Sequence, residues 1–200
     1  MRKSQYYTML AMFAAASGAI AEMHIAFPFP LLPFLEFDLA EIPDTLAFMI
    51  LGPKGGLISA GVHALILYII GSFTIFSPAM KLFAELSMFA GIYFGFKVGN
   101  KSRHKDGIIA GFGSIFRVIV MLFVTLALYY VIMPSIYLPT AKLAMSILGI
   151  SLTSPFEIAM LLAGLTSVFN LLAGLITIII AFAIIKSIIK IFPQLFPKVY

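Results

Sequence analysis

The chain has no cysteine and few charged residues. Only 10% of its 200 residues are Asp, Glu, Lys or Arg, against about 25% in soluble domains. The absence of cysteine excludes a disulfide framework and a thiolate metal site. The low charge, together with 62% hydrophobic residues, excludes an ordinary soluble domain. The composition therefore predicts a protein of the lipid bilayer.

Motifs of the common enzyme classes are also missing. The three histidines, His24, His63 and His104, lie in different segments without carboxylates at metal-ligand spacing. There is no HExxH or GxSxG motif, and the glycine-rich segments 52–56 (GPKGG) and 111–113 (GFG) lack Walker spacing. We therefore expect no catalytic residues, no metal site, no cofactor and no ATPase site in this chain.

Hydrophobic runs of membrane-spanning length predict an all-α integral membrane protein, folded as a single membrane domain over residues 1–200. The short alternating segments of a β-barrel fit the sequence poorly. Six spans are expected, at about Tyr6–Ala26, Leu39–Leu51, Gly55–Phe73, Ala79–Lys97, Ile108–Met133 and Phe156–Ile185. The second is short for a crossing, and Gly52-Pro53 ends it, because proline lacks a backbone donor and glycine bends freely.

Basic residues indicate the orientation, because they favour the cytoplasmic side of a membrane. Ten of the thirteen fall on one side of the expected spans: Arg2, Lys3, Lys54, Lys97, Lys101, Arg103, Lys105, Lys186, Lys190 and Lys198. Both termini are therefore expected inside, and segments 27–44, 74–78 and 134–155 outside. We expect a multi-pass protein of the cell membrane.

The segment after the first span is dense in proline and aromatic residues. Pro28, Pro30 and Pro33 restrict the backbone, while Phe29 and Phe37 offer large apolar faces. Such a segment suits an ordered structure better than a flexible linker. We expect residues 27–38 to form an ordered lid loop on the outer side.

The first span carries small residues four positions apart, at Ala11, Ala15 and Ala19. Small residues let helices approach closely in lipid, where hydrophobicity alone does not drive association. Two interpretations follow. The face packs within the chain, or it is a docking surface for another membrane subunit.

Ionisable and amide groups occur inside the expected spans, where they need a partner or an aqueous cavity. Lys81 and Glu85 are spaced for an intrahelical ion pair, and Arg117 can bond carbonyls or Glu85. The alternative is that these groups and Asn170 form the polar wall of a cavity. Further donors are available from Thr125, Tyr129, Tyr130 and Tyr137. An apolar, aromatic cavity with a few placed polar groups is typical of a small-molecule site.

The order of these segments resembles that of the membrane-embedded, substrate-binding S components of energy-coupling factor (ECF) transporters, especially the riboflavin-type branch. The resemblance covers most of the chain, and residues 27–56 carry its specific part. The matching positions are Phe27-Pro28-Phe29-Pro30, Phe37-Asp38, Ile42-Pro43, Gly52-Pro53, Gly56, Tyr129 with Pro134, and Phe169-Asn170 with Gly174.

The resemblance implies a six-helix subunit of an ABC importer, with an outward cavity capped by the lid, that captures a vitamin for ATP-driven uptake. Riboflavin is the first candidate substrate. Its partners would be a transmembrane coupling subunit, meeting Ala11, Ala15 and Ala19, and two cytoplasmic ATPase subunits. We expect the substrate-binding residues to be Leu35, Phe37, Asp38, Glu85, Arg117, Met121, Thr125, Tyr129, Phe169 and Asn170.

Several positions depart from the riboflavin-type pattern. Leu128 and Ala173 stand where an asparagine and a lysine are usual, and Glu85 stands where an asparagine is usual. Loss of such contacts typically costs about 1–3 kcal/mol, so a different vitamin or heterocyclic substrate stays open. Two other classes of protein also stay open. One is a stand-alone secondary transporter, for which Glu85 is the one candidate ion-coupling carboxylate. The other is a non-transport membrane assembly protein.

Overall fold

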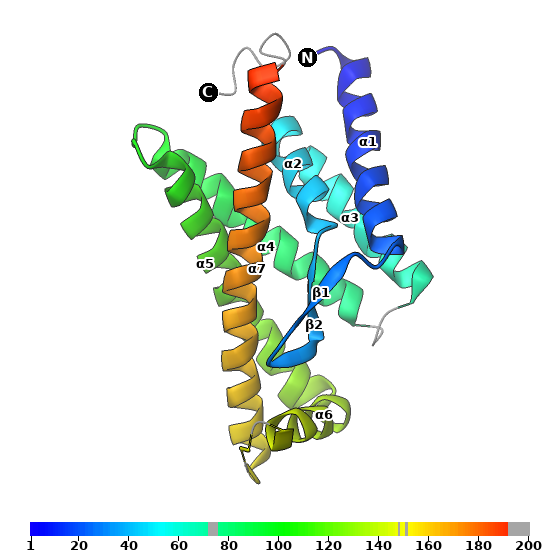
Figure 1. Ribbon diagram of the computed structural model, residues 1–200, viewed down its shortest axis with the longest axis vertical. Coiled ribbons are helices and arrows are strands. Elements are labelled where there is room, and N and C mark those ends of the chain that lie inside the picture. Colours follow the sequence, from blue (N-terminus) through cyan, green and yellow to red (C-terminus); the bar gives the residue numbers. More distant parts are fainter. Residues whose placement is uncertain (72–75, 148, 151, 192–200) are drawn as a thin grey trace.

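The computed structural model describes residues 1–71, 76–147, 149–150 and 152–191, and these residues are mostly helical (Figure 1). They form seven α-helices, a two-stranded hairpin and one π-helical turn, whereas six helices were expected. In chain order the elements are α1 Lys3–Glu22, β1 Ala26–Phe29, β2 Leu32–Asp38, α2 Glu41–Leu51, α3 Pro53–Ile70, α4 Ser77–Gly99, α5 Lys105–Leu126, η1 Ala127–Ile132, α6 Pro134–Ile147 and α7 Pro155–Ile191.

Four helical stretches in the described part of the chain are long and apolar enough to cross a membrane: Pro53–Ile70, Ser77–Gly99, Lys105–Ile132 and Pro155–Ile191. They correspond to the third to sixth expected spans. The helix α2 has only 11 residues and ends before Gly52, whose φ of 84° suits glycine, while Pro53 opens α3. The fold is therefore that of a mostly helical membrane protein.

The prediction of an outer loop over residues 134–155 is wrong for Pro134–Ile147, because these residues form α6. Pro134 lies at its start, where proline's missing donor costs nothing. Tyr137, Ala141 and Met145 are spaced four apart and are all buried, so one helical face packs into the core. This periodic apolar face was the sequence signal for a seventh helix.

The segment expected as a lid loop is ordered, but as a β-hairpin. β1 and β2 pair antiparallel, with Phe27 opposite Phe37 and Phe29 opposite Leu32. A two-stranded sheet has only edge strands, which tolerate prolines such as Pro28. Phe29 and Leu32 are buried, with 5% and 1% exposure, and so fix the hairpin against the helices.

The helix α5 packs along both α4 and α7, while α1, α2 and α3 pack together, with α2 also against α7 (Figure 1). Glycines permit the close approach of α4 to α5: a Cβ on Gly91 would lie 2.3 Å from the carbonyl oxygen of Phe112. The first turn of α1 and the last turn of α7 lie at the same end of the molecule. Some expected features lie outside the described residues: the end of the third span at Phe73, parts of segments 74–78 and 134–155, and Lys198.

Candidate functional site

A cavity of about 610 Å³ lies beside the hairpin, within the size range of small-molecule sites. Each described helix and strand contributes at least one lining residue, and the wall is mostly apolar. The lining residues include Phe34, Leu35, Asp38, Glu41, Met80, Lys81, Arg117, Met121, Tyr129, Tyr137, Phe169 and Asn170.

One part of the wall is aromatic. The rings of Tyr129 and Tyr137 stack with their centroids 4.4 Å apart. Phe169 on α7 also lines the cavity, and its ring packs against those of Phe37 at 4.9 Å and Phe29 at 5.7 Å. These contacts hold rigid aromatic faces at the cavity, which suits a planar aromatic ligand.

The other part of the wall is charged and anchored by Arg117. Its guanidinium binds the Glu41 carboxylate through Nη1–Oε2 at 2.5 Å and Nη2–Oε1 at 3.1 Å. Its Nε donates to Asn170 Oδ1 at 3.0 Å. Lys81 pairs with Asp38 and lies 3.6 Å from Glu41. The cations of the wall are thus already matched by carboxylates, so the wall favours a ligand of low net charge.

Asp38 joins the hairpin to this charged wall. It accepts hydrogen bonds from the backbone N–H of Ala40 and from Lys81. Burial raises the pKa of its carboxyl, but the Lys81 ammonium and the hydrogen bonds outweigh this effect and hold the pKa below its ordinary value. Asp38 is therefore a fixed negative charge at the base of the hairpin.

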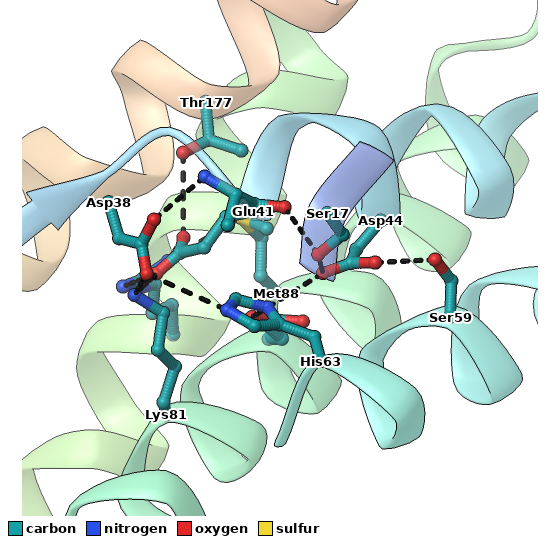
Figure 2. A network of polar contacts seen from close by, with 12 residues as sticks. Ser17, Asp38, Glu41, Asp44, Ser59, His63, Lys81, Met88 and Thr177 are labelled. Carbon is teal, nitrogen blue, oxygen red and sulfur yellow. Dashed lines mark hydrogen bonds and ion pairs between the residues drawn. The ribbon is translucent and has the colours of Figure 1, made fainter. Parts of the chain in front are cut away.

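A second polar cluster lies behind the wall and is centred on His63 (Figure 2). The imidazole Nδ1 lies 2.8 Å from Asp44 Oδ2 and 3.1 Å from Glu85 Oε1, and Nε2 lies 3.6 Å from Asp38 Oδ2. Asp44 also accepts hydrogen bonds from Ser17 and Ser59. The cluster joins α1, α2, α3 and α4 at a buried point.

Seven of the ten expected substrate-binding residues line the cavity: Leu35, Asp38, Arg117, Met121, Tyr129, Phe169 and Asn170. The other three are placed elsewhere. Phe37 packs behind Phe169, Glu85 faces His63, and the hydroxyl of Thr125 is buried with no hydrogen-bond partner among the described residues. Of the two alternatives for the charged groups, the structure favours the polar cavity wall: Lys81 pairs with Asp38 and Arg117 with Glu41, rather than either with Glu85.

Sequence reasoning missed Glu41 and His63. Glu41 lay where the expected outer segment 27–44 overlaps the start of the expected second span, Leu39–Leu51, and it was not counted among the site residues. His63 was set aside because its carboxylate neighbours lie 19 and 22 positions away, at Asp44 and Glu85. No local spacing could have shown that these residues meet.

The alanine face of α1 is exposed. Ala11, Ala15 and Ala19 all lie on the surface, while Gly18 faces inward, where an added Cβ would lie 2.3 Å from Ile66. The inward face is thus used for packing against α3, and the described residues leave the alanine face uncovered.

A solved structure, that of the S component of a bacterial ECF transporter, is similar to this chain, with a TM-score of 0.66. The alignment covers 95% of this chain and 98% of the other at 22% sequence identity. No protein-family model and no curated protein matches the sequence. The chain therefore has the fold of an ECF transporter S component.

Proposed function

We propose that this chain is the substrate-binding S component of an ECF-type importer. Its fold supports this class, and the observation that carries the proposal is the cavity beside the hairpin. An S component needs a site for a small molecule, and this cavity combines aromatic faces with a few fixed polar groups.

The substrate that we propose is an aromatic heterocyclic vitamin, with riboflavin as the first candidate. The stacked Tyr129 and Tyr137 rings and Phe169 offer flat apolar faces. The balanced charges around Arg117 and Lys81 favour an uncharged ring system with hydrogen-bonding groups over a strongly charged substrate. Leu128 and Ala173, which depart from the riboflavin-type pattern, are buried in the apolar core. Substrate polarity must therefore be met by other residues of this cavity.

The partners that we propose are a transmembrane coupling subunit and two cytoplasmic ATPase subunits. The exposed alanine face of α1 suits close helix contact in lipid. In this proposal the chain is not an enzyme: it binds the substrate, and the partner subunits hydrolyse ATP. The cell membrane is the expected location, with both termini inside.

The deciding experiment is to purify the chain in mild detergent and record the absorbance and mass spectrum of any small molecule that it carries. A bound flavin would support the full proposal. Another heterocyclic vitamin would keep the S-component assignment and reject riboflavin. If the chain carries no molecule and no compound of a vitamin panel stabilises it, the binding function is wrong.

A further inference from the structure

The polar network around His63 and Arg117 contains more carboxylates than cations. Its ion pairs join four carboxylates to two side-chain cations and one imidazole: Asp38, Glu41, Asp44 and Glu85 against Lys81, Arg117 and His63. Even with a protonated imidazole, four negative charges face three positive ones. An uncompensated charge in a buried network is costly, so one further positive charge is required.

The geometry shows where that charge belongs. Two carboxylates converge on the single Nδ1 atom of His63, Asp44 at 2.8 Å and Glu85 at 3.1 Å. One N–H can point at only one of them with good geometry. The second carboxylate oxygen of Glu85, Oε2, is buried and has no hydrogen-bond partner among the described residues. The side chains of His63 and Glu85 are each 1% exposed.

We propose that Asp44, His63 and Glu85 form a binding site for a divalent first-row transition metal ion of the Zn²⁺ or Mn²⁺ type. Each residue offers one ligand atom, and these atoms lie within 4.8 Å of one another. An imidazole nitrogen with two carboxylates is a donor set suited to these ions. The ligands come from α2, α3 and α4, so the ion would join three helices.

The surrounding residues orient this donor set as the outer partners of a metal site do. Asp44 is fixed by the hydroxyls of Ser17 at 2.8 Å and Ser59 at 2.5 Å. With Nδ1 on the metal, His63 Nε2 carries the proton, and Asp38 Oδ2 lies 3.6 Å from it, longer than a direct hydrogen bond. The negative charge of Asp38 still favours this tautomer of the ligating histidine.

A proton on Glu85 would supply the missing charge but not the missing contacts. On Oε1 it would face the Nδ1–H of a protonated His63, and on Oε2 it would have no acceptor among the described residues. A buried hydroxyl without an acceptor costs about 1–3 kcal/mol. A divalent ion with neutral His63 gives four positive charges against four negative ones and uses both carboxylates.

The site lies behind the cavity wall, to which it is linked through His63 and Asp38. The ion would therefore stabilise the base of the hairpin and the charged wall without touching the substrate. The inference does not depend on which substrate binds, because the three ligand residues, Asp44, His63 and Glu85, do not line the cavity.

The test uses untagged full-length protein, stripped with EDTA, reloaded with ZnCl₂ or MnCl₂ alone, and desalted. We expect one equivalent of metal per chain by mass spectrometry and a higher thermal unfolding midpoint after loading. Glu85→Gln and Asp44→Asn should lose both effects. Ser59→Ala, which keeps all three ligands, should bind about 10- to 100-fold more weakly.

Asp106→Asn is the matched control, because it removes a carboxylate from the exposed pair with Lys186 and should retain full metal binding. The inference is overturned if wild type and Glu85→Gln retain the same small amount of metal. It is also overturned if Glu85→Gln without metal is as stable as loaded wild type, since a protonated glutamate would then suffice. Substrate binding by the metal-free protein is measured separately, so either result leaves the S-component proposal to its own test.

Discussion

Arg117 on α5 and Glu41 on α2 form a two-point ion pair in the interior, with both side chains less than 5% exposed. The pair ties the short helix that follows the hairpin to a membrane-spanning helix. It therefore fixes the charged wall of the cavity relative to the hairpin.

Glu41→Gln should destabilise the protein by about 3–5 kcal/mol, because it leaves the buried Arg117 without a carboxylate. Combining it with Arg117→Met should recover part of that loss, since no unpaired charge then remains. Chemical unfolding in detergent measures both effects. Lys186→Met, which breaks an exposed pair with Asp106, should cost about 1 kcal/mol or less. Equal losses in Glu41→Gln and Lys186→Met would contradict the importance of the buried pair.

Tyr129→Ala and Phe169→Ala should weaken substrate binding about tenfold or more, because each removes an aromatic face of the cavity worth about 1.5–3 kcal/mol when covered. Quenching of riboflavin fluorescence measures this for the first candidate. Tyr130→Ala is the matched control, since that neighbouring side chain is 46% exposed and does not line the cavity. If Tyr130→Ala weakens binding as much as Tyr129→Ala, the substrate site has been misplaced.

Ala15→Leu should impair ATP-driven uptake by the assembled transporter while leaving substrate affinity unchanged. The larger side chain would keep a partner helix away from the exposed face of α1. Uptake in proteoliposomes and ligand binding in detergent separate the two effects. Ala90→Leu places the same bulk on an exposed position of α4 and should be neutral. Unchanged uptake by Ala15→Leu would rule out this face as the docking surface.

Gly91→Ala should be strongly destabilising, because its Cβ would collide with the Phe112 carbonyl oxygen and force α4 and α5 apart. Gly111→Ala on α5 meets open space and should stabilise by up to about 1 kcal/mol through helix propensity. Thermal unfolding of the two variants is a direct comparison. Similar midpoints would show that α4 and α5 are not in close contact at Gly91.

Much of the architecture followed from local pattern. Long apolar runs predicted the spans corresponding to α3, α4, α5 and α7, and Gly52-Pro53 predicted the break between α2 and α3. The seventh helix was missed because a 22-residue segment with three prolines was treated as a loop. Its buried positions, Tyr137, Ala141 and Met145, nevertheless have helical spacing.

The hairpin was harder to predict, because alternation is a weak signal in a segment interrupted by prolines. Its pairing depends on Phe29 and Leu32 entering a core that other helices complete. The cavity residues were easier, because polar or aromatic side chains inside an apolar span need a partner or a cavity. That rule found Arg117, Tyr129 and Asn170.

The sequence by itself determined that this is a helical membrane protein, where its main spans lie and which polar side chains needed partners, since hydropathy and desolvation cost act along the chain. Only the tertiary structure decided what those partners are. In the folded chain Arg117 pairs with Glu41, Lys81 pairs with Asp38, and His63 lies against Asp44 and Glu85. The physical reason is that an ion pair depends on distance in space, and these pairs join helices and strands that are remote in sequence but packed together by burial.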